Sequence, residues 1–192
     1  MKIQLIDINE NMIKCWHDQF DDCENVVIHQ GDIFSLPTDC IVSPANSFGF
    51  MDGGLDYIIS KKFGLGLQKE LQSAIKNTPL GEILVGDTAF ITTSNKDIPY
   101  LISAPTMRLP MIIKDTVNVY LAAKGIFTVL QKNNHLIKTV TISGLGTGAG
   151  GLDPSVCAKQ MREAYNFVYL MEREFPKSWR EALMEHNYLL IK

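Results

Sequence analysis

The sequence predicts an α/β fold in which a mostly parallel sheet carries helices on both faces. Short apolar segments alternate with longer amphipathic segments along the 192 residues, which is the pattern of strands separated by helices. Two glycine-rich loops each follow a predicted strand. Because ligands of such folds bind outside the carboxyl ends of the strands, both loops are expected to open on one ligand-binding edge.

The predicted strands are short runs of apolar residues, some alternating with polar residues and some continuous. They cover residues 2–8, 25–30, 39–43, 82–93 (interrupted at Gly86-Asp87), 100–104 and 138–143. The continuous runs at 39–43 and 138–143 are typical of strands that are buried on both faces.

The predicted helices place apolar residues at helical spacing and begin at residues that cap helices well. They cover residues 10–20, 55–77 with a break at 63–66, 116–132, 154–174 and 178–186. Asn9 is a good N-cap for the first helix, and Asp153-Pro154 combines an N-cap with a first-turn proline. Phe175-Pro176 is expected to end the long helix that starts at 154.

Length and composition indicate a single domain over 1–192, with no internal repeat and no linker. A net charge of −3 without basic runs gives no electrostatic case for a nucleic-acid partner, and none is expected. No leader and no membrane-spanning stretch are expected, so we expect a cytoplasmic protein. The four cysteines show no metal-binding spacing, and two of them, Cys40 and Cys157, are expected to be buried.

The second glycine-rich loop, from Ser143 to Gly151, contains five glycines among its nine residues. Its use would be to turn backbone N–H groups toward an anion, close to the N-terminus of the following helix. The alternative is a tight turn between strand and helix. It is not a Walker loop, because no Gly-Lys-Ser/Thr follows.

Three polar residues are candidates for ligand contacts in the first glycine-rich region, and each has a structural alternative. Asn46 could hold a ribose hydroxyl or orient a water, or it could simply cap its loop. Asp56 could be catalytic, or it could be an acid placed at a helix start. Asp32 could accept a hydrogen bond from an exocyclic amine, or it could be a turn aspartate.

Taken together, the motifs of this region resemble the signature of the macrodomain family. The matching stretches are Gly31-Asp32-Ile33, Ser43-Pro44-Ala45-Asn46, Gly53-Gly54-Leu55-Asp56, Ser103-Ala104-Pro105 and the loop from Ile142 to Gly151. The resemblance covers about residues 25–170 and implies a three-layer α/β/α fold with a mixed, mostly parallel sheet.

The resemblance also implies an ADP-ribose pocket that needs no metal and no cofactor. Asp32 and the Ile33 backbone would hold the adenine, and Asn46 would meet the distal ribose. The diphosphate would be wrapped by backbone amides, and the implied residues around the ligand are Ser43, Ala45, Gly53, Gly54, Gly146, Thr147, Gly148, Ala149 and Gly150.

The spacing of Asn46 and Asp56 resembles that of family members that hydrolyse ADP-ribosyl esters, with both residues orienting water. The expected partner is therefore ADP-ribose or an ADP-ribosylated substrate, and hydrolysis of an ADP-ribosyl adduct or of ADP-ribose-1''-phosphate is the expected reaction. The alternatives are a module that binds ADP-ribose without turnover, and a similar fold with another ligand or none.

The sequence departs from the family pattern in two loops and in its topology. Ser43 and Pro44 replace an asparagine and an alanine, and the aromatic that the family carries near Ala149 is missing, which opens the distal end of the pocket. Residues 1–20 look like the closing strand and helix of the family, as in a circular permutation.

Two more residues could reach the ligand from the same edge of the sheet. If residues 1–20 fill the closing position, only Met12 and Ile13 are available there as apolar partners for the adenine. Arg108 follows a predicted strand and could contact an anionic group, or it could be a solvated loop arginine.

Overall fold

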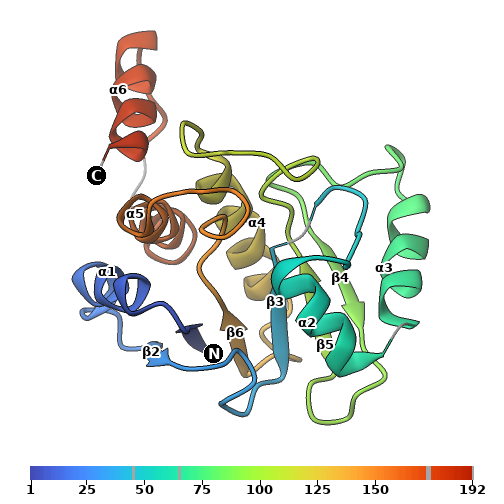
Figure 1. Cartoon of the computed structure of the whole chain (residues 1–192). Coiled ribbons are helices and arrows are strands. Elements are labelled where there is room, and N and C mark those ends of the chain that lie inside the picture. The colour runs from blue at the N-terminus through green and yellow to red at the C-terminus, as the bar shows by residue number, and fades with distance from the viewer. Residues whose placement is uncertain (45, 65, 172–173, 192) are drawn as a thin grey trace.

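A single mixed sheet forms the centre of the computed structural model, which describes residues 1–44, 46–64, 66–171 and 174–191. The sheet has six strands in the order β2-β1-β6-β3-β5-β4 (Figure 1). Every neighbouring pair is parallel except β4 with β5. The strands are β1 (Lys2–Asp7), β2 (Val26–Gln30), β3 (Cys40–Ser43), β4 (Ala89–Thr92), β5 (Tyr100–Ser103) and β6 (Thr139–Ile142).

Helices cover both faces of this sheet, as the sequence predicts. They are α1 (Glu10–Phe20), α2 (Gly54–Phe63), α3 (Gly66–Lys76), α4 (Asn118–Lys132), α5 (Pro154–Tyr165), the π-helical turn η1 (Asn166–Leu170) and α6 (Trp179–Leu190). One buried cluster joins α1, α4 and α5 to the sheet, and a second joins α2 and α3 to it. The predicted three-layer α/β/α architecture is therefore confirmed.

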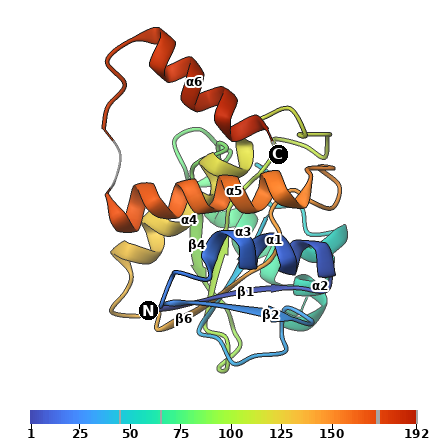
Figure 2. The ribbon, with the colours of Figure 1, turned by 90° about the vertical axis from the view of Figure 1, so that its left-hand side faces the viewer.

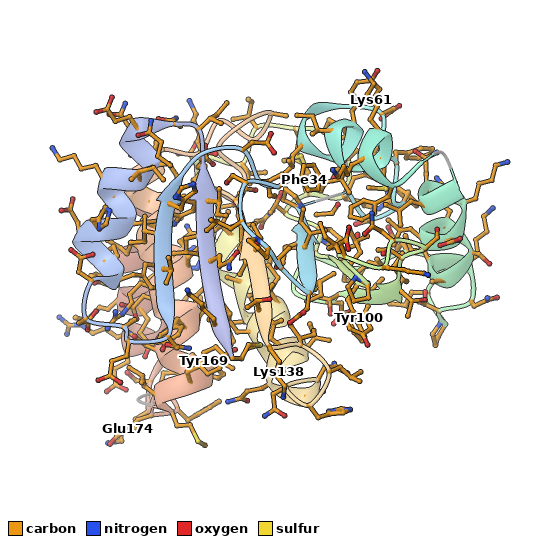
Figure 3. All side chains as sticks on the ribbon, turned by 90° about the horizontal axis from the view of Figure 1, so that it is seen from below. Phe34, Lys61, Tyr100, Lys138, Tyr169 and Glu174 are labelled. Atoms are coloured by element: carbon orange, nitrogen blue, oxygen red, sulfur yellow. The ribbon has the colours of Figure 1, made fainter. Side chains whose placement is uncertain are left out.

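Strand alternation assigns each side chain of the central strands to one of these two clusters. Val42 of β3 and Ile102 of β5 belong to the cluster under α1, α4 and α5. Their neighbours Ile41 and Leu101 belong to the cluster under α2 and α3. Phe34 (labelled in Figure 3) packs against the cluster under α2 and α3. Its ring lies edge-on to Phe63 of α2 with 6.1 Å between centroids.

The predicted helix starts are confirmed by their hydrogen bonds. The Asn9 side chain accepts from the amide of Asn11 at 2.9 Å, and the Asp153 side chain accepts from the amide of Ser155 at 3.0 Å. Each bond satisfies one amide that has no partner inside its helix. Cys40 and Cys157 are fully buried, as expected.

The predicted strand over 82–93 is wrong in its first half, since only Ala89–Thr92 forms a strand. Gly86 adopts a φ of 103°, a conformation that breaks the extended chain. Its carbonyl oxygen lies 2.4 Å from where a Cβ on Gly125 would be, so this loop packs directly on α4. Packing against a glycine of a distant helix, and not local propensity, sets the conformation here.

The predicted helix over 154–174 is also too long. Its α-helical part ends at Tyr165, and the π-helical turn that follows ends at Leu170, before Met171 with its left-handed φ of 53°. The last helix, α6, extends to Leu190 instead of ending at 186. It projects from the body (Figure 1), and its C-terminal end returns to α5 (Figure 2), where Gln160 Nε2 donates to the Leu189 carbonyl at 3.0 Å.

The N-terminal strand and helix are an integral part of the sheet and its cover. β1 lies between β2 and β6 and pairs in parallel with both. The carbonyl of Asp7 accepts from the Gly31 amide at 3.0 Å, so the end of β1 lies next to the predicted Gly31-Asp32 motif. That this unit replaces the family's closing unit stays a prediction. No helix among the described residues is long and apolar enough to span a membrane.

Candidate functional site

The glycine-rich loop after β6 forms a cradle of backbone amides at the N-terminus of α5. Gly146 has a φ of 68°, and a Cβ on it would lie 2.7 Å from Ile113 Cδ1. A Cβ on Gly150 would lie 2.5 Å from the Gly146 carbonyl oxygen. Among the described residues, none accepts a hydrogen bond from the amides of residues 146–150. Unpaired amides in a loop that leads into a helix are groups that can donate hydrogen bonds to an anion.

Three contacts hold the ends of this loop in place. Asp7 Oδ2 accepts from the Gly144 amide at 3.0 Å, and the Ile113 amide donates to the Gly150 carbonyl at 2.8 Å. Thr147 Oγ1 donates to the Gly144 carbonyl at 3.2 Å, so the Thr147 side chain serves the loop itself. Gly148 and Ala149 are exposed at the tip between these anchors. The predicted ligand residues 146–150 thus lie in one loop, whose ends are held by these hydrogen bonds.

The loop after β3, the neighbouring strand, ends at a second helix start. Gly53 caps α2 with an extended φ of −141°, and Gly54 has a φ of 54°. A Cβ on either glycine would meet nothing within 4 Å. Packing against protein therefore does not require glycine at these two positions. An open approach to the backbone at the N-terminus of α2 suits a second contact to an anion.

Asp56 lies in the first turn of α2, and the Ser43 hydroxyl at the end of β3 donates to its Oδ1. Burial raises the pKa of Asp56 to about 6. The hydrogen bond from Ser43 works in the opposite direction, and the negative charge of Asp52 adds to the increase. A carboxyl group with a pKa close to neutrality is suited to accept and return a proton.

Asn46 is buried, and its side chain is engaged by its own loop. Its Oδ1 accepts from the amides of Phe48 at 3.1 Å and Phe50 at 3.2 Å, and its Nδ2 donates to the Phe50 carbonyl at 2.9 Å. This is the capping arrangement that the sequence offers as the structural alternative. The structure pairs Asp56 with Ser43, and the catalytic role of Asn46 stays a prediction.

Asp32 and Ile33 follow β2 at the same edge of the sheet. Asp32 is exposed, and its Oδ1 accepts from the Phe34 amide at 2.8 Å in a turn. Its Oδ2 has no partner among the described residues, so one oxygen remains able to accept from a ligand. The Ile33 side chain is buried in the cluster under α2 and α3, which leaves only its backbone for ligand contacts.

Two of the remaining candidates are engaged elsewhere, and one lies outside the described residues. Met12 is fully buried beneath Gly144, so the prediction that it can stack on a base is wrong. Arg108 Nε pairs with Glu82 Oε2 at 2.7 Å, and its guanidinium lies 4.9 Å from the Phe48 ring centroid. Ala45 is a predicted ligand residue that falls outside the described residues.

The sequence-based prediction missed two residues that shape the site. Asp7 accepts a hydrogen bond from the Gly144 amide. Its place near the end of a predicted strand, at the edge where ligands bind, could have marked it as a candidate. The Ile113 side chain packs against Gly146 and Gly150 of the glycine-rich loop. No sequence signal pointed to Ile113, because only the three-dimensional fold brings it to the loop. No group of three acidic, histidine or cysteine residues among those described could hold a metal ion.

Comparisons with known proteins agree on one family. The model of the Macro domain matches residues 42–161. An uncharacterized protein of Aquifex aeolicus is 32% identical over 139 residues, which cover 72% of this chain and 79% of that protein.

Solved macrodomains share the fold. The macrodomain of Mycobacterium tuberculosis DarG superposes with a TM-score of 0.62 at 21% identity, covering 72% of this chain and 88% of that one. A mutant macrodomain of Oceanobacillus iheyensis, solved with ADPR, superposes with a TM-score of 0.60 at 18% identity. The match covers 80% of this chain and 86% of that one.

Proposed function

Because this chain belongs to the Macro domain family, we propose that it binds ADP-ribose across the carboxyl ends of β2, β3 and β6. The observation that carries the proposal is the set of unpaired amides at residues 146–150, at the head of α5. A diphosphate needs several donors without side chains in the way, and this loop offers them. The Oceanobacillus iheyensis macrodomain solved with ADPR supports the choice of ligand.

The neighbouring elements supply donors and acceptors for the two ends of such a ligand. The unpaired Oδ2 of Asp32 would accept from the adenine amino group at the end of β2. The open backbone at Gly53 and Gly54 would contact the diphosphate from the side opposite residues 146–150. The distal ribose would then lie toward Asp56, the acid in the first turn of the same helix.

We further propose that Asp56 makes the protein a hydrolase of a derivative at the distal ribose. With a pKa of about 6, Asp56 is ionised at neutral pH and can take a proton from an attacking water. Amides around the diphosphate would hold the charged part of the substrate while the bond to the distal ribose breaks. Both an ADP-ribosyl adduct and ADP-ribose-1''-phosphate fit this reaction class.

The second candidate is a module that binds ADP-ribose without turnover. The observation that favours it is the engagement of Asn46, whose amide is used by its own loop. Without a second polar side chain to orient the water, Asp56 would be a buried acid at a helix start.

Binding is tested first, by the melting temperature of the full chain with and without millimolar ADP-ribose. A ligand that binds only the folded state raises the melting temperature, and the stabilisation grows with the logarithm of its concentration relative to its Kd. We expect ADP-ribose to raise it and adenosine, which lacks the diphosphate, to raise it much less. Equal effects of the two ligands, or none, would contradict the proposed use of the glycine loops.

Turnover separates the two candidates. The wild type and Asp56→Asn are incubated with an ADP-ribosylated protein and with ADP-ribose-1''-phosphate, and release of free ADP-ribose is measured. A hydrolase loses about 100-fold or more of its rate in Asp56→Asn, as expected for removal of a general base, while binding ADP-ribose almost unchanged. A binding module releases no ADP-ribose with either protein.

A further inference from the structure

Three serines form a row across the carboxyl ends of adjacent strands. Ser43 is the last residue of β3 and lies in register with Ser103, the last residue of β5. On the other side of β3, Ile41 lies in register with Thr141 of β6. The pairing of β3 with β6 ends there, and Ser143 is the first residue after β6. The backbone amide of Ala104 donates to the Ser43 carbonyl at 2.9 Å, which fixes the strand ends next to each other.

The Ser43 and Ser103 side chains point to the face that carries α2. Side chains alternate along a strand, so Ser43 shares a face with Ile41, and Ser103 shares a face with Leu101. Both of these neighbours belong to the cluster under α2 and α3. The hydrogen bond from Ser43 to Asp56 of α2 agrees with this orientation. Ser43 therefore contacts the proposed catalytic acid directly, and Ser103 lies next to Ser43 on the same face of the sheet.

Two of the three hydroxyl groups have no partner. Ser103 is fully buried, Ser143 is 8% exposed, and neither Oγ makes a hydrogen bond to the described residues. Leaving a buried hydroxyl without a partner destabilises the folded state, because the group has lost its hydrogen bonds to water. Each such group in a protein calls for an explanation. Here the two unpartnered hydroxyls flank the one that contacts Asp56.

We propose that Ser103 and Ser143 donate hydrogen bonds to Ser43 when Asp56 is ionised, so that the three hydroxyls position the carboxylate as one network. After donating to Asp56, Ser43 Oγ keeps two lone pairs, one for each flanking hydroxyl. Neighbouring strands lie only about 4.8 Å apart, so hydroxyl side chains on the same face at adjacent strand ends can reach each other. Rotation of two serine side chains completes the network without movement of the backbone.

The network acts on Asp56 through Ser43, which makes Ser103 and Ser143 positioning residues. Donation to Ser43 polarises its own O–H and strengthens its bond to the carboxylate. A stronger bond to the charged form lowers the pKa of Asp56, against the effects of burial and of the Asp52 charge. Asp52 is the charged group that acts on Asp56 among the described residues. The catalytic meaning of this network rests on the proposed function, but the network itself is a property of the ligand-free protein.

The test is a ¹³C NMR titration of the Asp56 carboxyl in the ligand-free full chain. Ser103→Ala and Ser143→Ala are each expected to raise the pKa of Asp56 by about 0.3 or more, and Ser43→Ala by a larger amount. Ser60→Ala is the matched control, because this buried serine of α2 donates to backbone carbonyls and not toward the row. It should leave the pKa unchanged. Ser103→Thr, which keeps the hydroxyl, should restore the wild-type value.

A double-mutant cycle decides whether the effect passes through Ser43. In a Ser43→Ala background, Ser103→Ala is expected to cause no further change in the pKa of Asp56. The proposal is overturned if the single variants leave the pKa unchanged, or if Ser103→Ala has the same effect with and without Ser43. Because no nucleotide is present, either result is independent of whether the protein binds or hydrolyses an ADP-ribose derivative.

Discussion

Asp7 and Gly144 are 137 positions apart in the sequence, and a hydrogen bond of 3.0 Å from the Gly144 amide to Asp7 Oδ2 joins them. This bond connects the N-terminal strand to the start of the second glycine-rich loop. Asp7 also accepts from the Asn9 amide at 2.9 Å through its other oxygen. One carboxylate therefore holds both the entry to α1 and the loop that is proposed to bind the diphosphate.

Replacing Asp7 with alanine should weaken both stability and ligand binding. Losing two hydrogen bonds to a carboxylate is expected to lower the free energy of unfolding by about 2–3 kcal/mol. It should also weaken ADP-ribose binding, since Gly144 is no longer held. Asn9→Ala is the control, because it removes the cap of α1 but keeps the contact to Gly144. If both variants bind ADP-ribose equally well, Asp7 has no role in shaping the loop.

Asp56→Asn should stabilise the protein at alkaline pH. The pKa of Asp56 is about 6 in the folded state and 3.8 in the reference state, so the folded state retains a proton between these values that the unfolded state has lost. Stability therefore falls as pH rises through this window, by about 3 kcal/mol in total. Asparagine does not ionise and escapes this loss.

Urea unfolding at pH 4 and pH 8 measures the effect. The stability gain of Asp56→Asn over the wild type should approach its full value at pH 8 and shrink toward zero at pH 4. A gain of equal size at both pH values would show that the ionisation of Asp56 is not its cause.

If the protein is a hydrolase, its rate should follow the ionisation of Asp56. A general base works only when deprotonated, so the rate should rise with pH through a midpoint of about 6 and level off above it. Asp52→Asn removes a charge that raises the pKa of Asp56 and should move the midpoint to lower pH. A midpoint that does not move in Asp52→Asn would assign the profile to another group.

Gln160 should be essential for stability although it is remote from the site. This buried glutamine accepts from the Tyr120 amide at 3.0 Å and donates to the carbonyls of Thr116 at 2.9 Å and Leu189 at 3.0 Å. Gln160→Leu leaves these backbone groups without their partner and should cost about 2–4 kcal/mol. Gln131→Leu, where a single bond to Val168 is lost, should cost less. Chemical denaturation of both variants checks the order.

Patterns within one element predicted most of the fold. The caps at Asn9 and Asp153 and the buried run at residues 40–43 are local signals, and the structure contains the corresponding elements. The errors arise where distant residues decide the local structure. Gly86 packs against Gly125 of α4, and the chain around it does not extend the strand that its apolar residues suggest.

In the candidate site, too, local sequence predicted some features, whereas others depend on residues that are distant in the sequence. Glycine content alone indicated the loop at residues 143–151. The resemblance to macrodomains selected residues 146–150 within it, together with Asp32 and Asp56. The sequence could not show that the Asn46 side-chain amide hydrogen-bonds within its own loop or that Met12 is buried, because both depend on side-chain packing. Ser43 and Ser143 end two of the predicted strands, and Ser103 is the second-last residue of a third. That these strands are neighbours is known only from the pairing of the sheet.

Calorimetric titration of Gly148→Val with ADP-ribose tests the central claim most directly. Gly148 is exposed and lacks a left-handed φ, and a Cβ on it meets nothing within 4 Å, so the fold should accept valine while the approach to the amides is blocked. Gly66→Val, at an equally open position at the start of α3, is the control. We expect saturable binding of one ADP-ribose to the wild type and to Gly66→Val, and at least about tenfold weaker binding to Gly148→Val, a loss of about 1.4 kcal/mol. Equal affinity of the three proteins, or no binding to the wild type at millimolar ADP-ribose, would contradict the claim that this loop holds the diphosphate.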